Sequence, residues 1–184
     1  MNIFMVDSDP YVAAQCLCDK HVVKMILESA QMLSTAHRVL DGDKEGNLSD
    51  ANYDLALYNI THKNHPCSKW VRESRYNYDW LYYHMEALIG EYHFRYEKTH
   101  KCFSLITPLY KFPENIDHRT GPSDLPPCMP EEYKVPDDTI SSYRNYYRHG
   151  KAHLLKRRSI LRKIKELLIL QCRWLTELIS SWLR

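Results

Sequence analysis

The strongest constraint on the fold is a helical repeat of apolar residues between residues 68 and 100. The repeat has one gap, at Ser74, and it consists of Val71, Tyr78, Leu81, Met85, Leu88, Tyr92 and Tyr96. Intervals of three and four residues place these side chains on one face of a helix. The sequence therefore predicts a long helix over about residues 68–100.

A second long helix is predicted from about Pro10 to Leu40. Asp9 offers an N-cap and Pro10 a first helical position, while Gly42 lies in the polar stretch 41–50 that ends the helix. Residues 2–6 are apolar apart from Asn2 and indicate a short buried or strand-like tail. A shorter helix is predicted over about 51–61, ahead of the break at Asn64-His65-Pro66.

The C-terminal half is rich in proline. Residues 106–137 contain seven of the nine prolines, which predicts an ordered but irregular loop. Asp138 or Thr139 can then cap a last helical region, which Gly150 divides from a final amphipathic helix through Trp182. We expect an all-α, compact single-domain helical fold over residues 1–184, with a long Pro-rich loop.

The composition of the chain and the placing of its apolar residues and cysteines favour a cytoplasmic protein. The chain has no secretory signal and no apolar window long enough to span a membrane. Its six cysteines are scattered, which favours reduced thiols over a disulfide framework. Cys16 and Cys18 beside His21 could suggest zinc, but their spacing is not that of a structural zinc site. We therefore expect no metal and no organic cofactor.

The first predicted helix carries an unusual polar row. Five side chains share one sector, with Lys20 and Arg38 at its edge: His21, Lys24, Glu28, Gln31 and Thr35. The opposite face is predicted to be core, and it holds Val22, Val23, Ile26, Leu27, Ala30 and Leu33. The row is either a solvated surface with a Lys24–Glu28 pair, or a catalytic set of carboxylate, imidazole and amine.

A basic stretch runs from Thr139 to Lys165. It contains no acid and nine Lys or Arg residues: Arg144, Arg148, Lys151, Lys156, Arg157, Arg158, Arg162, Lys163 and Lys165. Tyr143, Tyr146 and Tyr147 are interleaved with them. Basic residues attract phosphates and aromatic rings stack on bases, so we favour nucleic-acid binding. A solvated helix and, for its distal part, a membrane-surface helix are the alternatives.

The start of the helix at 68–100 is also rich in groups that bind anions or bases. Lys69, Trp70 and Arg72 follow Asn64-His65-Pro66-Cys67-Ser68. A helix N-terminus with such side chains suits phosphates. The alternative is a capping segment with Trp70 in the core and Arg72 paired to Glu73 or Asp79.

These motifs resemble those of known proteins. Cys18 to Arg38, Asn64 to Ser74 and Met129 to Val135 resemble segments of a set of phage-encoded proteins, over about residues 1–156. More distantly, the chain is similar to the pyrimidine-dimer DNA glycosylases of the phage endonuclease V type. Asp19-Lys20-His21 followed by Glu28 has that family's spacing, and Tyr143 to Tyr147 with Lys151 is similar to its aromatic C-terminal segment.

The resemblance implies a helical DNA glycosylase with Glu28 as the catalytic carboxylate and an N-terminal α-amine as nucleophile. Here Met1 and Asn2 stand where that family exposes a small residue, and Leu27 and Gln31 stand where it flanks its Glu with arginines. Residues 157–184 look unlike the family and are expected to form a divergent helix. His21 would orient Glu28 or assist proton transfer, and Lys24 is the other candidate amine.

We therefore expect DNA with a damaged or modified base as substrate, excised with or without strand cleavage. Basic and aromatic side chains would hold it: Lys20, Gln31, Arg38, Lys69, Trp70, Arg72, Tyr143, Arg144, Tyr147, Arg148 and Lys151. The alternatives are a non-enzymatic nucleic-acid-binding protein and an enzyme on free nucleotides.

Overall fold

The computed structural model describes residues 1–42, 57–119 and 121–154, and within these ranges it contains helices and no strand. The α-helices are α1 Pro10–Cys16, α2 Asp19–Leu40, α4 Pro66–Glu73, α5 Arg75–Tyr96, α6 Ile106–Tyr110 and α7 Thr139–Asn145. Short helical turns are η1 Lys101–Leu105, η2 Glu131–Tyr133, η3 Tyr146–Gly150 and η4 Ala152–Leu154. The predicted all-α fold class is confirmed.

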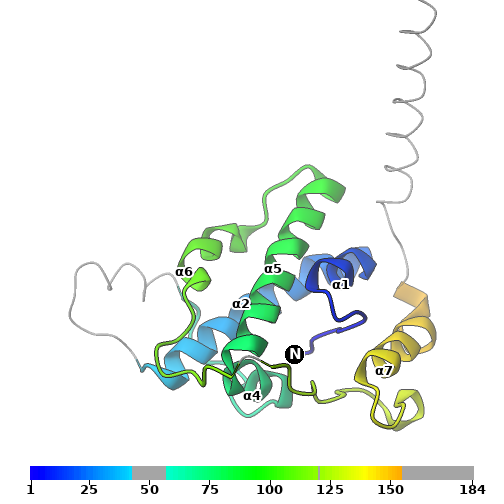
Figure 1. Ribbon diagram of the computed structural model, residues 1–184. Coiled ribbons are helices and arrows are strands. Elements are labelled where there is room, and N and C mark those ends of the chain that lie inside the picture. The colour runs from blue at the N-terminus through cyan, green and yellow to red at the C-terminus, as the bar shows by residue number, and fades with distance from the viewer. Residues whose placement is uncertain (43–56, 120, 155–184) are drawn as a thin grey trace, which may run out of the picture.

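The long helix α5 forms the centre of the core. It packs against α1, α2 and α4, which surround it in Figure 1. Its predicted apolar repeat is buried at Tyr78, Leu81, Met85 and Leu88, none of which is exposed at all. Helical periodicity therefore identified the buried face of this segment correctly.

The predicted single helix over 68–100 is two helices in the structure. Ser74 is extended, with φ −152° and ψ 157°, and its hydroxyl accepts the Asn77 N–H at 3.3 Å. Serine is a good N-cap, so the chain can end α4 and start α5 at this residue. At the other end α5 stops at Tyr96, and Glu97 is left-handed with φ 55°.

The predicted helix over 10–40 is also divided, at Leu17 and Cys18, although neither glycine nor proline stands there. Distant side chains bond the backbone groups that the break exposes. Arg95 donates to the carbonyl oxygen of Leu17 at 2.8 Å, and the Tyr147 hydroxyl accepts the Cys18 N–H at 2.7 Å. A break that costs helical hydrogen bonds is stable here because these groups replace them.

The N-terminal segment is a largely buried tail without helix or strand, and its burial was predicted. Ile3, Phe4 and Val6 are each at most 6% exposed. The N-terminus lies in the middle of the view, between the α4–α5 pair and α7 (Figure 1). The first residues of the chain are thus surrounded by three other parts of the fold.

The Pro-rich segment is ordered and mostly irregular, with α6 and η2 as its only helical turns in the described part. The Asp138 carboxylate accepts the Ser141 N–H at 2.8 Å and caps α7, as predicted. In the predicted helix over 51–61, the described residues 57–61 are not helical, and the rest lies outside the described residues. The predicted C-terminal helix and basic residues 156–165 also lie outside them. No helix in the described ranges is long and apolar enough to cross a membrane.

Candidate active site at the N-terminus

The carboxylate of Glu28 lies against the start of the chain. Its Oε2 accepts the backbone N–H of Asn2 at 2.9 Å and is 3.9 Å from the α-amine of Met1. The Glu28 side chain is only 11% exposed, so this contact is largely shielded from solvent. Two consecutive backbone nitrogens at the N-terminus therefore point at one carboxylate.

Lys24 completes the surroundings of this carboxylate. Its Nζ lies 3.2 Å from Oε1 of Glu28, one helical turn away, and its side chain is 69% exposed. The carboxylate thus has the N-terminus on one oxygen and a solvent-facing amine on the other. Met1, Asn2, Lys24 and Glu28 are called the amine–carboxylate site below.

The polar row of α2 is solvated only in part, since Lys24 is exposed, and the predicted division of this helix into core and polar faces is wrong in part. His21, Glu28 and Thr35 are buried, whereas Val23 and Leu27, predicted as core, are 37% and 39% exposed. The reason is tertiary: the N-terminal segment lies on His21 and Glu28, and Thr61 bonds Thr35, while no described segment covers Val23 and Leu27 to a similar degree. Gln31 is half-buried on the row.

His21 lies one turn before Lys24 and is held in a neutral form. Its Nδ1 is 2.8 Å from the Tyr147 hydroxyl, and Phe4 stacks on its ring with centroids 4.4 Å apart. Burial, then the charges of Lys151 and Lys24, lower the pKa of His21 to about 4, and Glu28 opposes this shift. At neutral pH His21 therefore carries no charge.

Asn2 is anchored through every polar atom of its side chain. Its Oδ1 accepts the Ile3 N–H and the Tyr143 hydroxyl, both at 2.8 Å, and its Nδ2 donates to the carbonyl oxygen of Cys128 at 3.0 Å. These bonds fix the direction of the Asn2 backbone nitrogen. The asparagine that departs from the resembled family is thus held in place by both ends of its side-chain amide.

Sulfur and imidazole groups lie on the other side of Asn2. Cys67 donates its S–H toward Cys128 Sγ, 3.6 Å away, and its sulfur is 3.8 Å from Asn2 Oδ1. This shared proton raises the pKa of Cys67 and lowers the pKa of Cys128. Burial, followed by the charge of the nearby α-amine, lowers the pKa of His65. Sequence spacing gave no sign of this cluster, because Cys67 and Cys128 are 61 residues apart.

Comparison with known proteins gives a family for this chain. The family model described as pyrimidine dimer DNA glycosylase matches residues 1–104 of the 184. The chain belongs to the pyrimidine dimer DNA glycosylase family. The searches of curated proteins and of solved structures returned no match.

The match to the glycosylase family includes the amine–carboxylate site and ends before the residues that anchor it. Met1, Asn2, Lys24 and Glu28 lie inside residues 1–104, whereas Cys128, Tyr143 and Tyr147 lie beyond them. The hydrogen bonds that anchor Asn2 and His21 therefore involve residues outside the segment that the family model matches.

The side chains predicted to bind DNA fall into two groups in the structure. Lys20, Lys69 and Arg148 are exposed, and the half-buried Lys151 places its Nζ 4.8 Å over the Tyr146 ring. Gln31 is half-buried, and the remaining side chains make hydrogen bonds within the protein. The hydrogen bonds join the Trp70 indole to Ser123, Arg38 to Leu57 and Tyr58, Arg72 to Ser68, Tyr143 to Asn2, Tyr147 to His21, and Arg144 to Val6 and Asp7.

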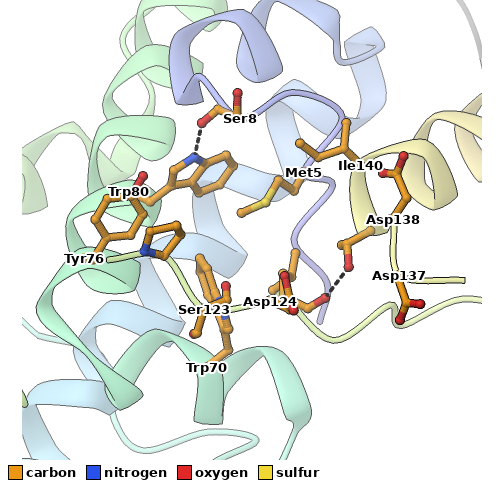
Figure 2. Close-up of a pocket in the computed structure, with 13 residues that line it drawn as sticks. Met5, Ser8, Trp70, Tyr76, Trp80, Ser123, Asp124, Asp137, Asp138 and Ile140 are labelled. Carbon is orange, nitrogen blue, oxygen red and sulfur yellow. Dashed lines mark hydrogen bonds between the residues drawn. The ribbon is translucent and has the colours of Figure 1, made fainter. Parts of the chain in front are cut away.

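A cavity of about 310 Å³ lies beside the N-terminal segment but does not include the amine–carboxylate site. Figure 2 shows Trp70, Tyr76 and Trp80 on one side and the carboxylates of Asp137 and Asp138 on the other, with Met5 between them. The Trp80 indole donates to the carbonyl oxygen of Ser8 at 2.7 Å. Carboxylates at this opening repel phosphates, so a DNA backbone is better placed on another face.

Proposed function

We propose that this protein is a DNA N-glycosylase that excises a damaged pyrimidine and then cleaves the strand through a Schiff base. The observation that carries the proposal is the contact of Glu28 with two N-terminal backbone nitrogens, at 2.9 and 3.9 Å. The membership of the chain in the pyrimidine dimer DNA glycosylase family supports the same chemistry.

In the first step the α-amine attacks C1′ of the damaged nucleotide. A C–N bond to the enzyme forms, the glycosidic bond breaks, and the base leaves with its electron pair and takes up a proton. Positive charge builds on the sugar in the transition state, and a fixed, partly desolvated carboxylate stabilises it. Glu28 meets this description, since it is buried and held by three nitrogen contacts.

In the second step the sugar ring opens and the amine adduct becomes an iminium ion. This ion acidifies the C2′ proton, whose removal expels the 3′ phosphate by β-elimination and cuts the strand. Glu28 is the nearest described carboxylate to the amine and can accept a proton. His21 lies two helical turns before Glu28 on α2 and is held neutral beside Tyr147, so Glu28 is the group proposed to take this proton.

Either state of the N-terminus presents an amine to Glu28. With Met1 retained, its α-amine is 3.9 Å from the carboxylate. With Met1 removed, the Asn2 nitrogen that now donates at 2.9 Å becomes the α-amine. Because the Asn2 side chain is bonded to Tyr143 and Cys128, this nitrogen keeps its direction in both states.

Cationic side chains would hold the duplex. Among the described residues, the side-chain nitrogens of Lys20, Lys69, Arg148 and Lys151 form neither a hydrogen bond nor an ion pair, so these predicted contacts can reach phosphates. Binding must also extrude the damaged nucleotide, because C1′ is otherwise enclosed in the stack.

Covalent trapping tests the proposal. We expect the protein to form a borohydride-stable adduct with ultraviolet-irradiated duplex and none with plain duplex. Residues added before Met1 should abolish the adduct, whereas Lys24→Ala should only reduce it. As a control, an extension that a protease removes to leave Met1 should restore it.

Two outcomes contradict the proposal in different ways. If the extended protein still traps, the α-amine is not the nucleophile. If the protein binds duplex but neither excises nor traps on any substrate, it is a nucleic-acid-binding protein and not a glycosylase.

A further inference from the structure

Three side chains outside the amine–carboxylate site offer a set of soft metal ligands. One donor atom each of His65, Cys67 and Cys128 lies within 4.8 Å of the others. Cys67 is buried, while His65 and Cys128 are partly exposed, so the cluster is buried on one side and open to solvent on the other. It is defined here as the His-Cys-Cys cluster.

The distance between the two sulfurs fits tetrahedral coordination of one metal ion better than a disulfide bond. Two thiolates on one zinc ion at about 2.3 Å each stand about 3.8 Å apart. The two sulfurs here are 3.6 Å apart, close to that separation. A disulfide would bring them to about 2.05 Å, which needs a movement of the backbone or side chains. We propose that the His-Cys-Cys cluster is a binding site for a thiophilic divalent cation of the zinc type.

The protonation changes on binding can be stated for each ligand. Cys67 and Cys128 each lose the thiol proton to solvent as a metal–sulfur bond forms, and the shared S–H contact is replaced by the shared ion. A neutral imidazole has a single lone pair, and that of His65 Nδ1 now accepts the Cys67 N–H at 3.2 Å. Coordination by His65 therefore replaces one capping hydrogen bond of α4. Solvent fills the fourth position.

The position of the cluster suggests a structural use for the ion. His65 and Cys67 start α4, and Cys128 belongs to the Pro-rich segment, so the ion would join two segments remote in sequence. Asn2 lies on this junction, bonded to the Cys128 carbonyl oxygen at 3.0 Å. The ion would hold the surface on which the N-terminal segment rests, and the excision chemistry would still need no metal.

Metal analysis of the untagged full-length protein tests the proposal. After exposure to Zn²⁺ and dialysis under reducing conditions, we expect one equivalent of zinc per chain and a higher melting temperature than for the chelator-treated protein. Co²⁺ in place of Zn²⁺ should give a thiolate-to-cobalt charge-transfer band. Cys67→Ser and Cys128→Ser should each weaken that band and lose the tightly held equivalent.

Controls separate this result from other causes. Cys16→Ser changes an exposed thiol outside the cluster and should keep the band and the equivalent. His65→Asn keeps a side chain that can cap α4 and should weaken binding without loss of helical content. Because Cys67 is buried, Cys128→Ser is the safer variant should Cys67→Ser fail to fold. The proposal is wrong if the protein with both thiols reduced retains no zinc, or if Cys128→Ser binds cobalt as the wild type does.

Discussion

At the scale of the residue, the strongest feature is the environment of Glu28. A carboxylate that is 11% exposed and faces the N-terminus has no obvious structural purpose on a helix surface. Its neighbours are nitrogen donors on both oxygens, which hold the carboxylate against the start of the chain. The polar row on α2 thus provides a fixed negative charge beside an amine.

The prediction for this residue is that Glu28→Gln abolishes excision and leaves the fold nearly intact. Glutamine keeps the shape and an acceptor for the Asn2 N–H but removes the charge that stabilises the sugar cation. We expect a loss of rate on the order of a hundredfold or more. Excision rates on irradiated duplex, with the melting temperature and duplex affinity as controls, measure this effect. A folded variant that excises at the wild-type rate would exclude Glu28 from the mechanism.

At the scale of the element, the two helix breaks decide where the site residues lie. Arg95 has no exposed side-chain area, and it bonds the Leu17 carbonyl oxygen and the carboxylates of Asp19 and Glu91. It therefore holds the α1–α2 junction to α5. Without that junction α2 could continue straight into α1, and His21 would lose its place beside Tyr147.

We predict that Arg95→Met destabilises the protein by about 3–5 kcal/mol, because two buried carboxylates lose their partner. Denaturant unfolding measures this change. Arg75→Met is the matched control, since Arg75 pairs with Asp79 on the surface and its side chain is 48% exposed. That variant should change stability by about 1 kcal/mol or less. Equal losses in the two variants would mean that Arg95 does not hold the junction.

The π-helical turn η3 gives a second prediction at this scale. A Cβ on Gly150 would lie 2.6 Å from the Tyr146 ring and 3.0 Å from the Tyr133 ring. Gly150→Ala should therefore shift this turn, which carries Tyr147, and reduce excision as well as stability. Gly90→Ala is the control: its Cβ meets nothing within 4 Å, and alanine in α5 should stabilise by about 0.5–1 kcal/mol. A Gly150→Ala protein with unchanged rate and stability would contradict the prediction.

At the scale of the whole molecule, buried histidines connect stability to pH. His84 is 1% exposed, stacks on Trp80, and has no hydrogen-bond partner for either ring nitrogen within the described residues. Burial lowers its pKa to about 3, and burial with two lysine charges lowers that of His21 to about 4. Both groups bind a proton more readily in the unfolded chain, where the ordinary pKa of histidine is about 6.5.

The sign of the pH effect follows from these lowered pKa values. The unfolded chain takes up protons first, so stability is full above pH 6.5 and falls as pH decreases toward 4 and then 3. We predict that His84→Leu moves the acid unfolding midpoint to lower pH and changes stability little at pH 7. His153→Gln, at an exposed histidine, should leave the midpoint in place. Acid titration followed by circular dichroism measures both, and identical midpoints for His84→Leu and wild type would refute the prediction.

Local sequence determined the parts of this protein that depend on neighbours in the chain. The repeat from Val71 to Tyr96 identified the buried face of α5, Asp9 and Asp138 indicated the starts of α1 and α7, and the spacing from His21 to Glu28 indicated the polar row. Helical periodicity and capping act over a few residues, so a single sequence displays them.

Only the tertiary structure decided the division of the first helix and the surroundings of the polar row. The break at Leu17 depends on Arg95 and Tyr147, which are 78 and 130 residues away from it. Glu28 is buried because the N-terminal tail lies on it, and Asn2 is fixed by Cys128 and Tyr143. Such contacts join residues far apart in the chain, and no local pattern encodes them because each partner alone is an ordinary arginine, tyrosine or cysteine.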